Sequence, residues 1–500
     1  MVRRNMQRAS QSRVFTIEDR AGPSHLPVYQ VLARVTGVTW GLGAVTPIRV
    51  PDPKRYGSYI VVDKIKGQVG LPTASLEVRS ARDRSALLSL AKKGCPIDLQ
   101  VHVGACKDPS DFDLGWEKIL VLEDADFTNY SLPALGAFDA DQEAAVMETL
   151  DLTASDMYEV SPLAFSPVGE SQIVQEVVDV LIADARTCGA CGLPSDGCQR
   201  VFAVQKAVGA SPGLPSEIIS SQDGGSTWQE ANITSLPVNK EPSAIAASGP
   251  YLVVVSHDDD SIHYAEIVDL LDDTATWVKV TSGIEASGSP VQIFSLGRTQ
   301  NWIVGDGGYV YFSDDVTVGV EAQTAGDVTS EDLKCVHGMD EANLIAAGAN
   351  NAILLTRNGG QTWVAVAGPG TKAAVTITAC WMMSENEWIL GYADGTVFYT
   401  IDGGGSWAQM AIPGSLTAID DIQFSTRSVG YIAGRAGAVA KLLRTISGGK
   451  SWYVLPEAAG ITLPSASQFN AIAACGDDPN VVFAGGVKTA GGDGIIVKGA

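Results

Sequence analysis

Basic side chains are scarce in this sequence, with 34 Lys and Arg against 57 Asp and Glu and a formal net charge of −23 at pH 7. Residues 1–160 hold 18 basic and 21 acidic side chains, which leaves 16 and 36 for the remainder. The charge excess therefore belongs to the larger, later part of the chain. Because such an acidic surface repels nucleic acid and anionic membranes, this part is not expected to bind either one.

Several patterns that would indicate chemistry or a membrane are also missing. The chain has no apolar run long enough to cross a bilayer, no nucleotide-binding loop and no nucleophile elbow. The N-terminal residues lack the apolar core of a signal peptide. Five histidines lie scattered without metal or triad spacing: His25, His102, His257, His263 and His337. We expect no cofactor and no membrane partner.

What the sequence does contain is a repeated octet. Ser221–Trp228 has the sequence SQDGGSTW, and versions of it return at Thr356–Trp363, Thr400–Trp407 and Thr445–Trp452. The last three copies begin 44 and 45 residues apart, and each follows a β-branched stretch such as Ala352–Leu355. A period near 40 residues, with a strand before a tight turn and a Trp after it, is typical of a β-propeller.

The octet has the composition of a tight turn. Its Asp or Asn bonds the turn backbone, its paired glycines supply positive φ, and its Trp opens the next strand with a large buried surface. We assign this structural role, and no catalytic one, to Ser221, Asp223, Gly225, Thr227, Trp228, Asn358, Gly360, Thr362, Trp363, Asp402, Gly404, Ser406, Trp407, Gly449, Ser451 and Trp452.

These copies resemble the Asp-box, or BNR repeat, of sialidases, sortilin-like receptors and the photosystem II assembly-factor propellers. In those families the box occupies the turn between the third and fourth strands of a blade, away from the central site. The resemblance therefore implies an architecture and does not identify a catalytic residue.

Aligning the chain on the octet predicts seven blades, in preference to six or eight, within residues 166–500. The first unit is short at its front and the last lacks its final strand. The β-branched segment Gln172–Ala185, within 172–186, is predicted to supply both missing strands, because closing the ring removes an open sheet edge. The units begin near Val201, Ala244, Val291, Leu333, Ile377, Ile419 and Phe469.

Residues 1–165 show no such period, and 500 residues are too many for one core, so we expect a separate domain there. Ser80–Lys93 has helical spacing and ends at Gly94. The domain is predicted to be a β-sandwich or barrel with one helix, preceded by a flexible arm over residues 1–25 that carries Arg3, Arg4, Arg8 and Arg13. Its strand-like runs are Tyr29–Val35, Tyr59–Ile65, Ser75–Val78, Ile97–Val103, Ile119–Leu122 and Glu148–Leu152.

This domain resembles the tail tube proteins of tailed bacteriophages. The resemblance lies in the expected sandwich with one helix and an N-terminal arm, and in Trp116–Ala125 followed by residues 144–155. The phrases Val45–Ile48 with Pro51–Pro53, and Gly94–His102, look similar to an uncharacterised family of phage structural proteins. The tail tube resemblance implies a virion structural protein, made in the host cytoplasm, whose hexameric rings stack into a tube that conducts DNA as cargo. Other tail proteins would then be partners, and the propeller would decorate the exterior and meet a host surface or glycans.

The charge distribution within the first domain bears on such stacking. Residues 1–55 hold 9 basic and 3 acidic side chains, whereas residues 56–160 hold 9 and 18. A basic arm that docks on an acidic neighbour suits ring stacking, but a solvated basic tail fits the same counts.

Cysteines give one further candidate site. Cys188, Cys191 and Cys198 have the spacing Cys-x2-Cys-x6-Cys, which suits zinc but lacks a fourth ligand nearby in sequence. A disulfide between two of the three and plain thiols are the alternatives. Three other cysteines fall at first-strand positions and are expected to be buried thiols: Cys335, Cys380 and Cys475.

The main alternative to a structural protein is a glycan-active or glycan-binding propeller, and another is a cellular assembly or adhesion module. A sialidase-like site needs clustered arginines, and Arg357 lies inside an octet. Carboxylate pairs that run glycoside hydrolysis lie about 5–9 Å apart, but abundance alone identifies no pair. The run Asp258–Asp260 has ligands for calcium, although a solvated turn is the simpler interpretation. The arginines after residue 200 are Arg298, Arg357, Arg427, Arg435 and Arg444.

Overall fold

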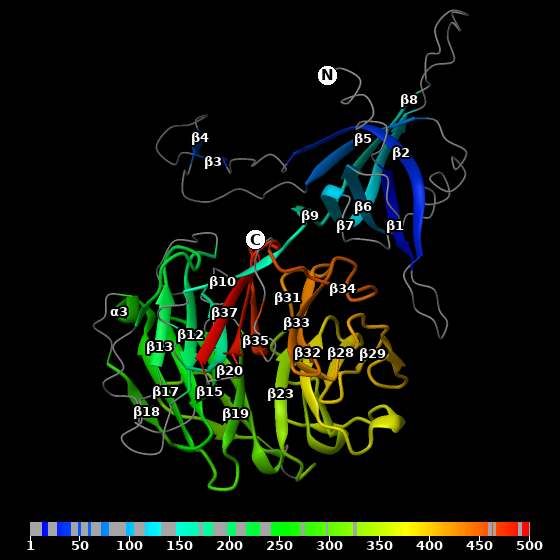
Figure 1. The fold of residues 1–500 in the computed structure, drawn as a ribbon. Coiled ribbons are helices and arrows are strands. Elements are labelled where there is room, and N and C mark those ends of the chain that lie inside the picture. Colours follow the sequence, from blue (N-terminus) through cyan, green and yellow to red (C-terminus); the bar gives the residue numbers. More distant parts are fainter. Residues whose placement is uncertain are drawn as a thin grey trace, which may run out of the picture. The chain divides into compact units, whose positions relative to one another are not determined.

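A computed structural model divides the chain into two compact units, Met1–Pro162 and Leu163–Ala500 (Figure 1). The division falls three residues earlier than the predicted 165/166 boundary, because residues 165–168 form a strand of the second unit. The structure describes residues 13–18, 28–41, 49–51, 59–61, 72–79, 97–104, 116–131, 147–169, 173, 175–183, 198–206, 217–230, 242–271, 276–296, 299–323, 328–458, 463, 467–488 and 493–499.

Seven described strands of the first unit form an antiparallel sheet in the order β6-β1-β2-β5-β8-β7-β9, and β3 pairs with β4 in a separate sheet. A further pairing between β6 and β7 closes the larger sheet into a ring of strands. The helix predicted at Ser80–Lys93 lies outside the described residues. The likeness of this unit to a tail tube domain stays a prediction. Its strands are β1 (Arg13–Glu18), β2 (Val28–Gly41), β3 (Arg49–Pro51), β4 (Tyr59–Val61), β5 (Thr73–Arg79), β6 (Ile97–Gly104), β7 (Trp116–Ser131), β8 (Met147–Thr153) and β9 (Asp156–Val160).

Strand β1 corrects the prediction of a flexible arm over residues 1–25. It pairs with β2, where Glu18 lies opposite Val28, and with β6, where Arg13 lies opposite His102. The sequence RVFTIE explains this, because β-branched and aromatic residues favour strands.

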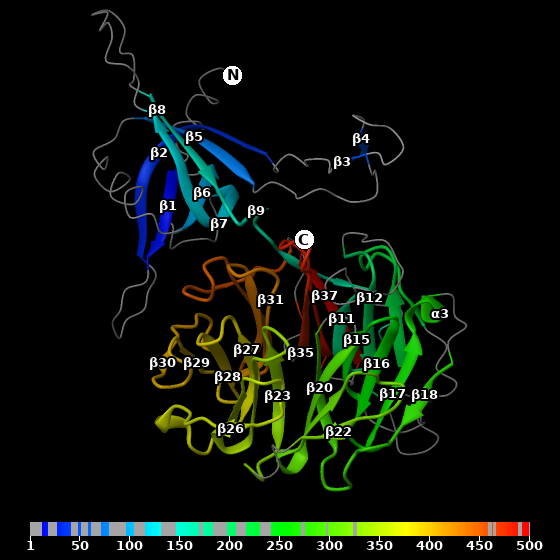
Figure 2. The same ribbon diagram turned by 180° about the vertical axis from the view of Figure 1, so that it is seen from behind.

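The second unit is a β-propeller of seven four-stranded antiparallel sheets in its described residues (Figures 1 and 2). Each inner strand contacts the inner strand of the next sheet, and β35 contacts β11, so the ring is closed. Blades 1 to 7 are numbered in the order in which their inner strands occur. Six of the seven predicted unit starts lie within two residues of the first residue of an inner strand. The seventh, Val201, begins the second strand of blade 1.

The strands of blades 1 to 4 are β11 (Val177–Ile182), β12 (Val201–Gln205), β13 (Glu217–Ser221), β14 (Gln229–Glu230), β15 (Pro242–Ser248), β16 (Tyr251–Ser256), β17 (Ser261–Glu266), β18 (Val278–Val280), β19 (Pro290–Leu296), β20 (Gln300–Gly305), β21 (Val310–Ser313), β22 (Glu321–Ala322), β23 (Leu333–Gly338), β24 (Leu344–Gly348), β25 (Ile353–Thr356) and β26 (Val364–Ala365). Those of blades 5 to 7 are β27 (Ile377–Met382), β28 (Trp388–Tyr392), β29 (Val397–Thr400), β30 (Ala408–Gln409), β31 (Ala418–Phe424), β32 (Gly430–Ala436), β33 (Val439–Thr445), β34 (Tyr453–Val454), β35 (Ser467–Ala474), β36 (Val482–Lys488), β37 (Asp493–Gly499) and β10 (Phe165–Val168).

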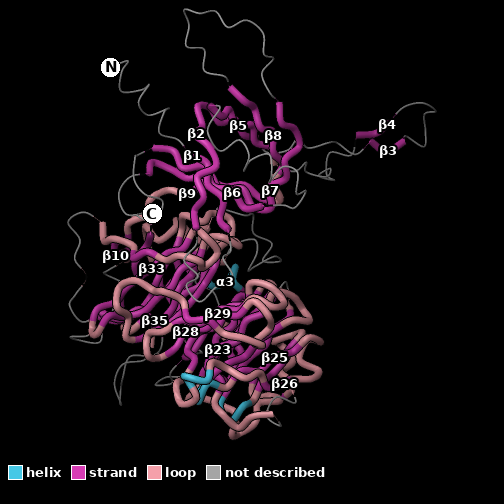
Figure 3. The backbone as a smooth tube through the Cα atoms, turned by 90° about the vertical axis from the view of Figure 1, so that its right-hand side faces the viewer, coloured by secondary structure: helices cyan, strands magenta, loops and turns pink. Residues whose placement is uncertain are grey.

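Helical structure is sparse in the described residues (Figure 3). The short helix α3 (Ile267–Leu271) connects the third and fourth strands of blade 2, where other blades have the octet turn. Trp277 stays buried after this helix, at the place that the octet Trp takes in blade 1. Blade 2 has therefore kept the buried ring and replaced the turn.

The ring closes with strands from both ends of the unit. Strand β10 is the outer strand of blade 7 and pairs with β37, beside which it lies in Figure 1. Strand β11 is the inner strand of blade 1 and pairs with β12. Only β11 lies in the predicted segment 172–186. The strands before and after this point thus belong to the last and the first blade, at the outer and the inner edge respectively.

Candidate binding site at the ring centre

The octets form the turns between third and fourth strands, far along each blade from the inner strand. In blade 1 the Ser221 hydroxyl donates to Asp223 Oδ1 at 2.9 Å, and Asp223 also accepts the Thr227 N–H at 2.8 Å. Gly225 donates its N–H to Ser221 Oγ and has φ +86. A Cβ at Gly225 would lie 2.7 Å from the ring of Phe483, so both φ and space require glycine there.

The same hydrogen bonds recur in the other octets. Asn358 Oδ1 accepts the Thr362 N–H at 3.0 Å, and Asp402 Oδ1 accepts the Ser406 N–H at 2.8 Å. In blade 6 a serine, Ser447, takes the place of Asp. The remaining octet positions lie in these turns too: Gly360, Trp363, Gly404, Trp407, Gly449, Ser451 and Trp452. The turns order the backbone and place no side chain at the ring centre.

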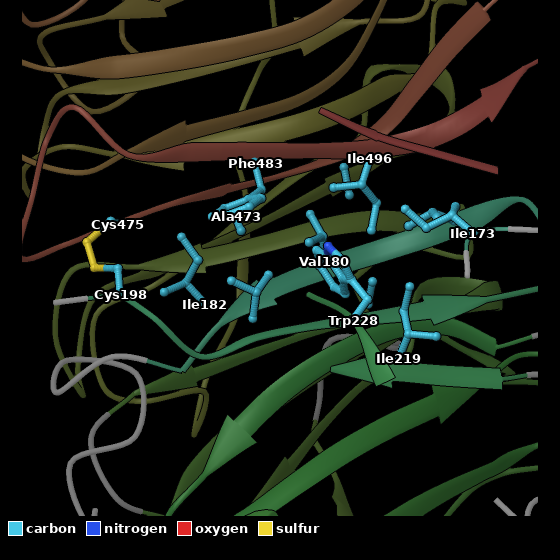
Figure 4. Packing of buried hydrophobic residues seen from close by; sticks show 14 residues of the cluster. Ile173, Val180, Ile182, Cys198, Ile219, Trp228, Ala473, Cys475, Phe483 and Ile496 are labelled. Carbon is cyan, nitrogen blue, oxygen red and sulfur yellow. A yellow bond between two sulfur atoms is a disulfide. The ribbon is translucent and has the colours of Figure 1, made fainter. Parts of the chain in front are cut away.

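The tryptophans that follow these turns pack between blades. The Trp228 ring of blade 1 contacts Phe483 of blade 7 edge to face, with centroids 6.5 Å apart. Figure 4 shows the buried cluster to which both belong, formed by strands of the first and last blades, with Val180 and Ile496 in it. This cluster is the apolar part of the ring closure.

A disulfide lies at one end of that cluster and corrects two predictions. Cys198 bonds Cys475, with Cα atoms 6.0 Å apart and a sequence separation of 277 (Figure 4). Cys198 therefore bonds a cysteine of blade 7, and it is not a zinc ligand or a disulfide partner of Cys188 or Cys191. Those two cysteines lie outside the described residues. Cys475 is buried as predicted but is not a free thiol, whereas Cys335 and Cys380 are buried and free.

The inner strands share a feature that the repeat alignment did not reveal. Each has a register shift at the same place, so one residue per blade bulges out of the pairing with the second strand. The bulged residues are Val178, Ser243, Val291, Lys334, Thr378, Asp420 and Asn470. This common bulge gives the seven strands one register, in which positions can be compared around the ring.

One residue after the bulge, three blades carry a side-chain acceptor that bonds the backbone of the next blade. The inner strand lies at the edge of its sheet, so some of its N–H groups have no partner strand. A side-chain acceptor from the preceding blade supplies the hydrogen bond that such an N–H group needs. The bonds run from Ile245 N–H to Asp179 Oδ2, from Val336 N–H to Gln292 Oε1 and from Ile472 N–H to Asp421 Oδ2, each 2.8 Å between heavy atoms.

The other junctions are bridged from neighbouring positions. His337 Nδ1 accepts the Met382 N–H at 3.1 Å and so joins blades 4 and 5. The bulged residues of blades 2, 5 and 7 instead donate to a carbonyl of the following blade, from Ser243 to Pro290, from Thr378 to Ile419 and from Asn470 to Val177. Every one of the seven junctions thus has a side-chain bond to the next backbone.

Two of these acceptors are carboxylates at the ring centre. Burial raises the pKa of Asp179 to about 7; the Asp421 carboxylate adds to the rise, and the N–H groups of Ile245 and Val180 oppose it. Burial likewise raises the pKa of Asp421 to about 6. Neither carboxylate forms an ion pair with a lysine or arginine among the residues that the structure describes.

Ion pairs surround the end of the ring at which the inner strands begin. Asp306 accepts from His257 Nε2 at 2.8 Å and from Lys334 Nζ at 3.2 Å, which links blades 2, 3 and 4. Arg435 lies 3.6 Å from Asp420, whose pKa burial raises to about 6. Lys334 and Arg435 are therefore committed to neighbouring carboxylates.

Two weaker sequence candidates are not assembled into sites. Asp259 of the Asp258–Asp260 run bonds Lys279 at 2.7 Å, and no group of three or more His, Cys, Asp or Glu side chains in the described part of the chain is arranged to hold a metal. Arg357 pairs with Glu385, and Arg444 is buried against Tyr431. The described arginines thus form no cluster for a carboxylate ligand.

Three residues after the bulge, aromatic rings occupy three successive blades. Phe294, His337 and Trp381 are each half-buried. The His337 and Trp381 rings stack with centroids 3.8 Å apart, and Phe294 lies 4.8 Å from His337. We call these three residues the axial aromatic row. Sequence reasoning missed it, because only the shared bulge aligns these positions.

Comparison with known proteins identifies the fold. No protein-family profile and no curated protein sequence matches the chain. It is similar to a solved streptogramin B lyase, at 13% identity and TM-score 0.51 over 68% of this chain and 97% of that one. It is also similar to a catalytically inactive virginiamycin B lyase from Staphylococcus aureus solved with quinupristin, at 10% identity and TM-score 0.50 over 68% and 99%.

YCF48 from Cyanidioschyzon merolae is similar at 16% identity and TM-score 0.48, over 67% of this chain and 98% of that one. At these identities the likeness shows the fold alone, a multi-bladed β-propeller. The described residues contain no helix long and apolar enough to cross a membrane.

Proposed function

We propose that the propeller unit is a binding module for a positively charged partner protein and has no catalytic role. The observation that carries this proposal is the use of the polar side chains at the ring centre. Asp179, Gln292, His337 and Asp421 already bond the backbone of the next blade, so they act in holding the ring together. The excess of 36 acidic over 16 basic side chains after residue 160 favours a cationic partner.

A sialidase-like activity is the less favoured alternative. Such a site needs several arginines that converge on one carboxylate, and the described arginines are dispersed. Arg357 lies at an octet turn and Arg444 bonds the carbonyl of Pro479 in the interior. Arg435 is paired with Asp420.

Glycoside hydrolysis by a carboxylate pair has one observation in its favour, the raised pKa of Asp179 and Asp421. A raised pKa is what a general acid requires. However, each carboxylate accepts two backbone N–H groups, Asp179 from Ile245 and Val180. A carboxylate fixed in this way serves the fold, and its raised pKa follows from burial.

The tail tube assignment of residues 1–165 rests on sequence resemblance alone, and the matches reported above are to propellers only. As part of this proposal it is kept as the hypothesis for how the chain assembles. In that case the partner bound by the propeller would belong to the same particle or to a host surface.

Peptide binding by the full chain tests the binding function. We expect fluorescein-labelled octalysine to bind, with an affinity that falls steeply as salt is added, because screening weakens exposed charge pairs. Octaglutamate should not bind, and a panel of aryl glycosides should not be hydrolysed. Equal behaviour of the two peptides would overturn the proposal, as would glycoside turnover that Asp421→Asn abolishes in a folded protein.

A further inference from the structure

The large apolar side chains that the described part of the propeller exposes gather at one end of the ring. Successive strands of a blade are antiparallel, so the connection between the first two strands and the turn between the last two lie at the same end, the octet end. Of the seven exposed large apolar side chains in the described residues, one, Val328, lies at the opposite end, in the connection from blade 3 to blade 4. The other six lie in connections of the octet end or begin a fourth strand there: Val268, Val278, Val318, Met339, Val364 and Ile401.

The connections of blades 4 and 5 form one continuous surface at the octet end. In blade 4 the Gly359 N–H of the octet turn donates to the Ala342 carbonyl at 3.0 Å. Arg357 of the same turn pairs with Glu385 of blade 5 at 3.2 Å. The octet turn of blade 5 in turn donates the Gly403 N–H, at 2.9 Å, to the connection that contains Glu385. We call these four connections, residues 339–343, 357–363, 383–387 and 401–407, the octet face.

Charge on the octet face is negative. Its four connections hold five acidic side chains and one basic one, Arg357, which pairs with Glu385. The other four carboxylates form no ion pair in the part of the chain that the structure describes: Asp340, Glu341, Glu387 and Asp402. Each of the two exposed large apolar side chains of this face precedes a carboxylate in sequence, as Ile401 precedes Asp402.

The opposite end of the ring differs in both respects. Three of its carboxylates, Asp306, Asp332 and Asp394, each pair with a lysine. Val328 is its one exposed large apolar side chain in the described residues, and it is 36% exposed, against 63% for Ile401 and 44% for Met339. The octet face thus combines unpaired negative charge with exposed apolar side chains, and the opposite end does not.

Resting on the proposed binding function, we propose that the cationic partner protein docks on the octet face through a segment in which Lys or Arg alternates with apolar side chains. Apolar side chains that gather on one exposed surface mark an interaction site, because covering them removes apolar area from water. The unpaired carboxylates around Met339 and Ile401 select a segment of positive charge. The same carboxylates repel an anionic partner, and a polar cationic segment would leave the apolar side chains uncovered.

Charge reversal in the full chain tests the location. Glu341→Lys combined with Glu387→Lys should weaken octalysine binding at low salt by about tenfold, because two attractions become repulsions. Glu285→Lys combined with Glu331→Lys makes the same change of net charge in connections of the opposite end, and this matched control should weaken binding by less than about twofold. Thermal melts establish that each variant is folded. An equal loss in both pairs would overturn the octet face while leaving salt-dependent binding, and hence the proposed function, in place.

Substitution of the exposed apolar side chains tests the second half of the proposal. Met339→Ser combined with Ile401→Ser should weaken the binding of an octapeptide of alternating Lys and Leu by about tenfold and leave octalysine binding unchanged, because only the first peptide covers apolar area. Val328→Ser is the control at the opposite end and should bind both peptides like the unchanged protein.

Three results would contradict the docking surface. Equal binding of the alternating peptide by the double serine variant and the unchanged protein would overturn the octet face. Self-association of the chain that this double variant abolishes would assign the face to a second copy and overturn the docking of another protein there. Absence of octalysine binding to the unchanged protein would overturn both the octet face and the proposed function.

Discussion

At the scale of single residues, the central carboxylates stabilise the ring through hydrogen bonds and destabilise it through their charge. Asp179 accepts two N–H groups, one of them from the next blade. Its pKa of about 7, against an ordinary value of 3.8, means that the folded state retains a proton that the unfolded chain has already released. Stability therefore falls as pH rises through this window.

The pH dependence of unfolding gives the residue-scale prediction. The free energy of unfolding should decrease from about pH 4 to about pH 7, by at most about 4 kcal/mol from Asp179, with Asp421 and Asp420 adding to the decrease up to about pH 6. Asp179→Asn keeps a carbonyl acceptor and removes the charge, so the decrease should become shallower. Chemical denaturation at a series of pH values measures it.

Asp402→Asn is the control for this slope. Hydrogen bonds from Ser406 lower the pKa of Asp402 to about 2, so its contribution is lost only as pH falls below the ordinary range of a carboxyl. Its removal should leave the slope between pH 5 and pH 8 unchanged. If the free energy of unfolding depended on pH in the same way in Asp179→Asn and in the unchanged protein, the prediction would be wrong. That result would mean that folding does not raise the pKa of Asp179.

At the scale of elements, the ring closure combines a strand exchange with a covalent bond. Strand β10 covers the edge of β37, β11 covers the edge of β12, and Cys198 links the two blades at the loops that follow β11 and β35. A cross-link over 277 residues restricts the unfolded chain strongly. We expect this closure to determine the stability of the whole propeller.

Removal of the disulfide tests the closure. Cys475→Ala should lower the free energy of unfolding by about 2–5 kcal/mol under oxidising conditions, and a reductant should lower that of the unchanged protein by a similar amount. Cys198→Ala combined with Cys475→Ala should cost no more than either alone, because one bond is lost in each case. Denaturant titrations measure all of these.

Cys335→Ala provides the control, since this thiol is buried and free. It should have a small effect that does not depend on the reductant. A Cys475→Ala protein whose stability matches that of Cys335→Ala in oxidising buffer would contradict a closing role for the disulfide.

The elements also show what the sequence could predict. The octet turns and six unit starts follow from local chemistry, because Asp, paired Gly and Trp determine a turn within eight residues. Strand β10 was missed because FSPV is short and contains a proline, which edge strands tolerate. The Cys198–Cys475 bond and the axial aromatic row depend on residues from different blades, and only the closed ring brings those together.

At the scale of the whole molecule, the two parts of the chain differ in charge. The propeller carries most of the acidic excess, whereas residues 1–55 are basic. An acidic ring and a basic N-terminal stretch on the same chain allow copies to attract one another. Ring formation and stacking, implied by the resemblance to tail tube proteins, is therefore the assembly to be tested.

The full chain is predicted to form rings or stacked tubes visible by negative-stain electron microscopy. Deleting residues 2–11 should block stacking, because it removes Arg3, Arg4 and Arg8 while leaving β1 in the sheet. Deleting residues 2–24 should in addition lower the melting temperature, because β1 pairs with both β2 and β6. The difference between the two deletions separates the role of the basic residues from that of the strand. Sedimentation of the full chain as a monomer at high concentration, without filaments, would contradict tube formation. It would not affect the proposal that the propeller binds a cationic partner.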